Sequence, residues 1–219
     1  MVTTGMATRW WWVRHGPVPS QRGLIYGQRD VSCDTSDVVA FQGLAKTLPK
    51  DAVWVTSNLV RTHETLHAIW QQNGKQGDPL SEPDFAEQSF GDWEGLAWDD
   101  FHAAKDPAYA KFWEDPGNNS MPGGESFADL IERVRTVIER LTEEHAGSDI
   151  VAVTHSGTIR SAIAVALGLD ATQALNVTVD CLALSRIDYL SSAEGVSRGG
   201  WRVSGINLPP YDSNLEERI

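Results

Sequence analysis

Three short apolar runs, each ending in polar residues, restrict most strongly what this chain can fold into. The runs cover residues 10–13, 52–55 and 150–153. Each is long enough for a buried strand, and helical patterns at about 58–73 and 159–167 follow the second and third runs. Repeated strand, loop and helix units predict a parallel α/β sheet, whose ligand sites lie beyond the carboxyl ends of the strands.

The remaining elements fit one α/β domain. Further strands are predicted at 182–187 and 201–206, and apolar residues spaced three and four apart predict an amphipathic helix over 126–146. We therefore expect residues 1–219 to form a single domain, a three-layer α/β/α sandwich with a mostly parallel central sheet. A helical insertion at about 88–125 is expected to cover the active site.

The charge balance excludes several classes of function. The chain has 30 acidic side chains against 18 lysines and arginines, a net charge of −12, which argues against a general binder of nucleic acids or anionic membranes. Any anionic ligand must meet a local basic pocket. Because no signal-like start or membrane-length apolar run occurs, we expect a soluble, cytoplasmic protein. Cys33 and Cys181 are expected to be buried free thiols.

One motif favours a different chemistry. His63, Glu64 and His67 form an H-E-x-x-H pattern on a predicted helix, a spacing that can bind zinc in metalloproteases. The longer signature with a glycine and a third histidine is absent, although Glu82 or Glu87 could supply a third ligand. Histidines beside an apolar helix stripe are common in proteins without metal. We therefore favour a protein without a metal or cofactor and keep the zinc protease as an alternative.

A second group of polar residues is distributed over the chain but follows the predicted strands. Arg14 and His15 follow the first strand, Arg61 follows the second, and His155 follows the third. Surface arginines and ordinary core histidines would explain any one of these positions but not their shared placement. Together the four side chains predict a compact cationic site suited to the oxygens of a phosphoryl group.

These residues resemble the motifs of the histidine phosphatase superfamily, also called the phosphoglycerate mutase-like superfamily. The R-H-G motif lies at 14–16, the S-x-x-x-R pattern at 57–61, the G-x-x-x-G pattern at 91–95, and the late histidine with its small neighbour at 155–156. The resemblance runs in order from residue 10 to about 190. The segments at 90–95 and 122–126 are most similar to the broad-specificity and α-ribazole phosphatase branch.

The resemblance implies a role for each of these side chains. His15 is the expected nucleophile, which forms a phosphohistidine without a metal. Arg14, Arg61 and His155 are expected to bind the phosphoryl oxygens, and His155 also counts among the catalytic residues. Gln21 stands where the family often has an asparagine that binds the phosphate.

Glu87, four residues before the G-x-x-x-G pattern, matches the family's general acid and base. It would protonate the leaving oxygen and then activate water. The neighbouring carboxylates of Glu82, Asp84 and Glu94 are its rivals for this role.

The resemblance is compatible with two activities, hydrolysis of a phosphate ester and transfer of a phosphoryl group. Mutases need additional cations for a highly charged substrate, whereas residues 96–124 carry two lysines, no arginine and five acids, and Pro17 replaces a glutamate common in mutases. We favour hydrolysis of a small phosphomonoester, with α-ribazole phosphate as one candidate. Phosphoglycerate mutase-type transfer and a catalytically inactive regulatory or binding module remain alternatives. No residue pattern identifies a protein partner or an oligomeric state.

Aromatic and basic residues around the predicted site have two interpretations each. Trp98, Phe101, Phe112 and Trp113 could flank an aromatic leaving group, although packing is the favoured reading. Arg22 and Arg29 lie in a loop expected to border the pocket, and the sequence does not decide whether they touch the substrate.

Overall fold

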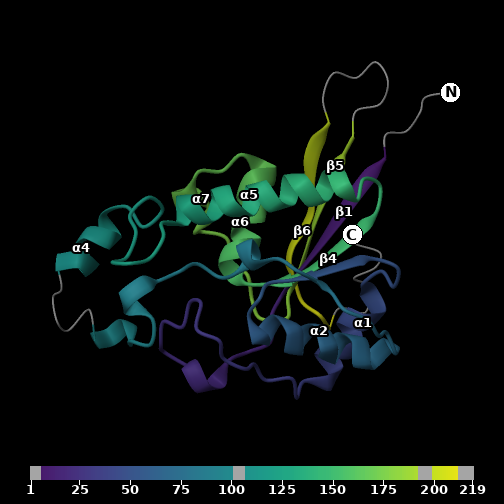
Figure 1. Cartoon of the computed structure of the whole chain (residues 1–219), viewed down its shortest axis with the longest axis horizontal. Helices are drawn as coiled ribbons and strands as arrows, with labels where there is room; N and C mark the ends of the chain where they lie inside the picture. Colours follow the sequence, from purple (N-terminus) through teal and green to yellow (C-terminus); the bar gives the residue numbers. More distant parts are fainter. Residues whose placement is uncertain (1–5, 101–106, 192–198, 212–219) are drawn as a thin grey trace.

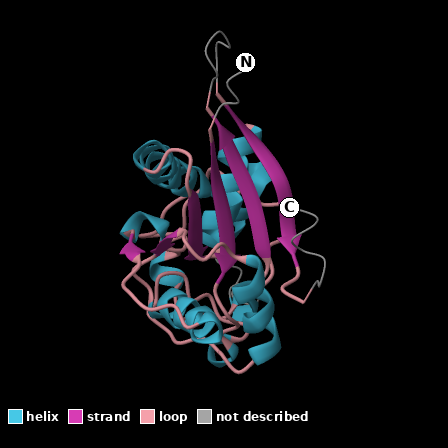
Figure 2. Cartoon of the chain, turned by 90° about the vertical axis from the view of Figure 1, so that its right-hand side faces the viewer, coloured by secondary structure: helices cyan, strands magenta, loops and turns pink. Residues whose placement is uncertain are grey.

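The computed structural model describes residues 6–100, 107–191 and 199–211. In these residues one mixed sheet has the strand order β3-β2-β4-β1-β5-β6 (Figure 2). The strands are β1 (Ala7–Arg14), β2 (Val53–Thr56), β3 (Leu80–Ser81), β4 (Asp149–Thr154), β5 (Leu184–Leu190) and β6 (Gly200–Leu208). The four strands β3, β2, β4 and β1 pair in parallel, whereas β5 pairs antiparallel with both of its neighbours, β1 and β6. The predicted mostly parallel α/β fold is confirmed.

Helices cover both faces of this sheet (Figure 1). One face carries α1 (Val38–Thr47) and α2 (Val60–Asn73), and the other carries α5 (Phe127–Glu144), α6 (Ser156–Leu167) and α7 (Ala171–Ala174). Two separate apolar cores result, one under α5 and α6 and the other under α1 and α2. The architecture is therefore the expected three-layer sandwich.

The three consecutive tryptophans of β1 contribute side chains to both cores. Trp10 and Trp12 stack on one another with ring centroids 4.9 Å apart in the core under α5 and α6. Trp11 points to the opposite face, where its indole N–H donates to Asp149 at 2.9 Å. Side chains alternate along a strand, so three adjacent large side chains require cover on both faces. This packing makes β1 a central strand and fixes the level at which the next residues leave the sheet.

The helix after β2 begins differently from the sequence expectation. The helical pattern was expected from about residue 58, but α2 begins at Val60, and its N-cap residue Leu59 makes no side-chain capping bond. The Val60 N–H instead donates to the Asp30 carboxylate at 2.7 Å. The Ser57 hydroxyl lies at the end of β2, 2.7 Å from Nε2 of His155.

The segment between residue 88 and α5 packs around a small hydrophobic cluster that is separate from the two main cores. Ile25, Trp93, Phe112 and Met121 form this cluster, and Phe112 belongs to the helix α4 (Pro107–Glu114). Figure 1 shows α4 at one end of the molecule, away from the sheet. Phe101, one of the aromatic residues singled out in the sequence, lies outside the described residues.

No helix in the described part of the chain is both long and apolar enough to cross a membrane.

Candidate active site

The two predicted site histidines meet at the carboxyl ends of adjacent parallel strands. Arg14 in β1 is in register with Thr154 in β4, so His15 and His155 leave the sheet at the same level. The His15 backbone N–H donates to the Thr154 carbonyl at 2.8 Å. The two imidazole rings lie edge to face with centroids 5.2 Å apart, and both side chains are fully buried.

The His15 ring is held so that one nitrogen is available for attack. Its Nδ1 lies 2.7 Å from the Gly16 carbonyl oxygen, and because a carbonyl only accepts, Nδ1 carries the proton. Nε2 then has a free lone pair. Burial, followed by the charges of Arg61 and Arg14, lowers the pKa of His15 from 6.5 to about 3. The ring is therefore neutral at physiological pH, as a nucleophile requires.

This low pKa has a consequence for stability. The unfolded chain protonates His15 near pH 6.5, whereas the folded chain does so only near pH 3, so the unfolded state binds more protons between these values. The free energy of unfolding should therefore fall as the pH falls, by about 3 kcal/mol from this residue between pH 7 and pH 4. Urea unfolding of the wild type and His15→Asn at both pH values measures this difference. An equal pH dependence in the two proteins would contradict it.

His155 is oriented by a hydroxyl from the neighbouring strand end. Its Nε2 lies 2.7 Å from Ser57 Oγ, and that hydroxyl also accepts the Leu59 N–H at 3.2 Å. When the Ser57 hydroxyl donates to Nε2, the proton of His155 sits on Nδ1. That Nδ1 atom is buried and has no partner among the described residues. Burial lowers the pKa of His155, and the nearby charge of Arg61 lowers it further, so His155 offers a neutral N–H.

The two predicted phosphate-binding arginines are fixed by backbone carbonyls. Arg14 donates from Nη1 to the Val179 carbonyl at 2.6 Å, and Arg61 donates to the carbonyls of Arg29 and Gly27 at 2.8 and 2.6 Å. In the described residues no carboxylate forms an ion pair with either guanidinium. The Nε atoms of both arginines are buried without a partner among the described residues. Two fixed and uncompensated cations beside His15 suit an anionic ligand.

Glu87 joins this group through the start of α6. Its Oε1 accepts the backbone N–H of Gly157 at 3.0 Å and the backbone N–H of Gln88 at 2.9 Å. A Cβ atom at position 157 would lie 2.2 Å from that oxygen, so glycine there leaves the room that the carboxylate occupies. Because Gly157 lies two residues after His155, the contact brings Glu87 to the histidine pair.

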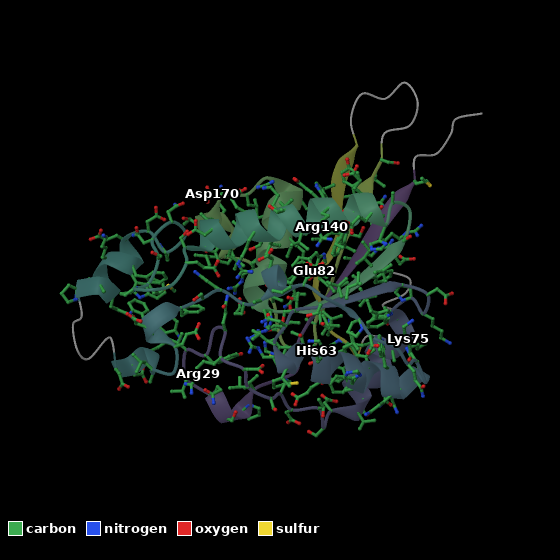
Figure 3. All side chains as sticks on the ribbon, in the orientation of Figure 1. Arg29, His63, Lys75, Glu82, Arg140 and Asp170 are labelled. Carbon is green, nitrogen blue, oxygen red and sulfur yellow. The ribbon has the colours of Figure 1, made fainter. Side chains whose placement is uncertain are left out.

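The rival carboxylates are engaged elsewhere. Glu82 forms an ion pair with Arg140 of α5 at 2.7 Å, and both residues are labelled in Figure 3. Glu94 accepts the backbone N–H groups of Gln28 and Phe90, which ties together two loops. Asp84 is exposed. Of these four acids, the geometry favours Glu87 for proton transfer.

A half-buried ion pair between Arg133 and Glu125, which the sequence did not indicate, holds the Glu87 segment. Arg133 contacts the Glu125 carboxylate through Nε and Nη2 at 2.9 and 2.7 Å, and the same Nη2 donates to the Glu87 carbonyl at 3.0 Å. The Glu125 carboxylate in turn accepts the Ser89 N–H at 2.8 Å. Arg133 Nη1 also donates to the Asp84 carbonyl at 2.6 Å, so Arg133 of α5 holds the backbone on both sides of the Glu87 side chain. Glu125 lies within the 122–126 segment that carried the resemblance, which is the one sequence signal for this pair.

The loop at 21–27 contributes an aromatic wall to the site. Tyr26 lies edge to face against His15 with centroids 6.5 Å apart, and the Arg61 guanidinium lies 5.2 Å from the Tyr26 ring centre. Burial raises the pKa of Tyr26. Gln21 has a buried Oε1 without a partner in the described chain, and no hydrogen bond joins its side chain to His15 or to the arginines. Its role in phosphate binding stays a prediction.

The H-E-x-x-H residues take part in packing and local hydrogen bonds. The Glu64 carboxylate accepts the Cys33 N–H at 2.8 Å, and His63 Nε2 lies 3.4 Å from Thr56 Oγ1. His67 packs edge to face against Trp70. Within the described ranges no three His, Cys, Asp or Glu side chains are placed to hold a metal ion.

The sequence matches the family model of the histidine phosphatase superfamily, branch 1, over residues 10–202. The chain therefore belongs to the histidine phosphatase superfamily. Relatives named as phosphatases support the prediction that it is a phosphatase.

Two relatives from Arabidopsis thaliana illustrate the match. Phosphoglycerate mutase-like protein 4 is 32% identical over 154 residues, which cover 68% of this chain and 66% of that protein, just under two thirds of its length. A metal-independent phosphoserine phosphatase is 27% identical over 204 residues, with 85% of each chain covered. Among solved structures, the α-ribazole phosphatase from Shigella flexneri matches 91% of this chain and 96% of its own, with 25% identity and a TM-score of 0.75.

Proposed function

We propose that the chain is a metal-independent phosphomonoester hydrolase that acts on a small phosphorylated metabolite through a phosphohistidine intermediate. One observation carries this proposal. The free Nε2 of a neutral His15 lies in a buried site with three polar atoms that lack partners among the described residues: Nε of Arg14, Nε of Arg61 and Nδ1 of His155. Buried donors without partners are rare in folded proteins, and a bound phosphoryl group would satisfy all three.

In the first step, His15 Nε2 attacks phosphorus in line with the leaving oxygen. The N–P bond forms as the bond from phosphorus to the ester oxygen breaks, and the Glu87 carboxylic acid gives its proton to that oxygen. Arg14, Arg61 and the Nδ1–H of His155 stabilise the three equatorial oxygens as their charge redistributes. The products are an alcohol and a phosphorylated His15.

In the second step, the Glu87 carboxylate takes a proton from a water molecule, whose oxygen attacks phosphorus from the vacated side. The N–P bond breaks, its electron pair returns to His15 Nε2, and inorganic phosphate leaves. Glu87 is protonated again, so the cycle needs neither a metal nor another co-reactant.

Hydrolysis rather than transfer to a sugar acid is favoured by charge. Residues 96–124 carry two lysines and five acids, so the insertion lacks the set of additional cations that a mutase needs for a bisphosphorylated sugar acid. Aromatic side chains line the cavity that opens beside Glu87, so a leaving alcohol with an apolar or aromatic body fits, and α-ribazole phosphate is one such candidate.

A chelator-treated assay tests this function. The protein is dialysed against EDTA and then given p-nitrophenyl phosphate with no bisphosphorylated primer. We expect turnover that is unchanged by the chelator, because the cycle uses only side chains of this chain. Activity that disappears with EDTA and returns with zinc would overturn the proposal in favour of the metal alternative. Turnover that requires a bisphosphoglycerate primer would favour the mutase alternative.

A further inference from the structure

A cavity leads from Glu87 away from the two histidines. It has a volume of about 460 Å³ and lies between the insertion and the helices α6 and α7. Glu87 and Gly157 border it at the reacting end, and aromatic side chains, including Trp98 and Trp113, line the insertion side. Arg160 lies on the α6 side and was not singled out in the sequence. The position of this cavity, next to the expected proton donor, is that of the leaving alcohol.

Arg160 is a half-buried cation that forms no ion pair with a described residue, although the Glu87 carboxylate lies close enough to raise its pKa. Its Nε donates to the Val177 carbonyl at 2.7 Å, which fixes the plane of the guanidinium. Neither terminal nitrogen forms a hydrogen bond or an ion pair with another described residue. Burial is the main influence on its pKa and lowers it. A partly desolvated guanidinium with free donors at a cavity wall is suited to bind an anion from solution.

Arg160 and the phosphate-binding Arg14 are held by the same segment. Arg14 donates to the carbonyl of Val179 and Arg160 to the carbonyl of Val177. Two residues of chain span at most about 7 Å, so the two anchoring points are that close. The two guanidinium groups are therefore anchored to neighbouring points of one segment, and Arg160 lines the same cavity as Glu87.

We propose that Arg160 is a specificity-determining residue that binds an anionic group, a carboxylate or a second phosphate, on the leaving alcohol. The preferred substrates are then phosphomonoesters whose alcohol combines an apolar or aromatic body with a negative charge a few atoms from the ester oxygen. This inference rests on the proposed function, because Arg160 meets the alcohol only if the phosphoryl group sits at His15. If Arg160 has this role, phosphate esters of charged aromatic alcohols are better substrates than esters of neutral alcohols such as α-ribazole.

Three substrates built on one ring test this inference. Phenyl phosphate has no second charge, 3-carboxyphenyl phosphate adds a carboxylate, and resorcinol bisphosphate adds a phosphate. The ratio of kcat/KM for each charged compound to that for phenyl phosphate is measured in the wild type, in Arg160→Gln and in Arg135→Gln. Arg135 is an exposed arginine of α5 paired with Glu132, so it is a matched control for the loss of one positive charge.

We expect the wild type and Arg135→Gln to prefer at least one charged compound by about 10- to 100-fold, the usual effect of a hydrogen-bonded charge pair. In Arg160→Gln the preference should fall to about threefold or less. The compound that shows the preference distinguishes a carboxylate from a phosphate ligand. Thermal unfolding of each variant checks that the fold is retained.

Binding to the His15→Ala variant separates this inference from the proposed function. Dissociation constants of the three compounds are measured there with and without Arg160→Gln. A charge preference in binding that needs Arg160 supports the inference even if the wild type shows no turnover, which would overturn only the proposed reaction. Equal binding of charged and uncharged compounds, or a preference that survives Arg160→Gln, would overturn the inference.

Discussion

Replacing His15 with alanine is expected to lower kcat by about 10⁴-fold or more, because the nucleophile that carries the phosphoryl group is lost. The remaining arginines can still bind phosphate, so the dissociation constant for inorganic phosphate should change far less than kcat. The comparison is made with p-nitrophenyl phosphate under saturating conditions. A loss in kcat with phosphate binding retained identifies a chemical role for His15 and not a structural one.

His67→Ala is the matched control for this substitution. His67 is an exposed histidine of the H-E-x-x-H pattern that packs against Trp70. We expect its replacement to leave kcat within about twofold, as is usual for surface substitutions. If His67→Ala were as damaging as His15→Ala, a metal site on α2 would be the better explanation.

Replacing Glu87 with glutamine should slow the reaction by about 10²- to 10⁴-fold, the usual contribution of general acid and base catalysis. Which of the two steps becomes slower should depend on the leaving group. A p-nitrophenolate ion leaves without a proton, so the first step should survive as a rapid burst of one p-nitrophenol per site, followed by slow turnover. An alkyl phosphate needs the proton, so its burst should disappear.

Glu82→Gln provides the control for the Glu87 variant. Glu82 is in the same segment but pairs with Arg140 on α5. We expect normal kinetics with both substrates. If instead the Glu87 variant lost the burst equally with p-nitrophenyl and alkyl phosphates, Glu87 would not act as a proton donor, and a role in positioning would be the better account.

The ends of the strands β1, β2 and β4 were predictable because each strand ends close to the point where its apolar run ends in the sequence. The runs at 10–13, 52–55 and 150–153 fall within β1, β2 and β4 or one residue from them, and the residues that follow are those that meet at the site. A parallel sheet then places Arg14, His15 and His155 together without further information. The sequence therefore indicated the general fold and which side chains meet at the strand ends.

Among the elements that were not predicted, β3 and α1 have weak sequence signals. β3 has two residues and is defined by its pairing with β2. In α1 the first turn begins with exposed Val38 and Val39, and Gly43 interrupts the helical pattern. Gly43 approaches the Pro210 backbone so closely that a Cβ atom could not fit, a reason visible only in the folded chain.

The contacts that orient the site residues depend on long-range geometry. Ser57 and His155 are 98 residues apart in sequence, and nothing in either motif indicates that the hydroxyl selects the histidine tautomer. Arg160 sits on an alanine-rich helix, where an arginine is ordinarily a solvated surface residue. Its position at the cavity wall follows from how α6 packs against the insertion. The proposed specificity contact thus depends on packing, whereas the proposed reaction type rests on motifs.

The most direct test of the account is a rapid-quench experiment for the phosphohistidine. The wild type is mixed with a labelled phosphomonoester, and parallel samples are quenched in acid and in alkali. The account predicts label on the protein that is stable in alkali and lost in acid, that accumulates in Glu87→Gln with a good leaving group, and that is absent in His15→Ala. Turnover without protein-bound label, or label that remains in His15→Ala, would contradict His15 as the nucleophile.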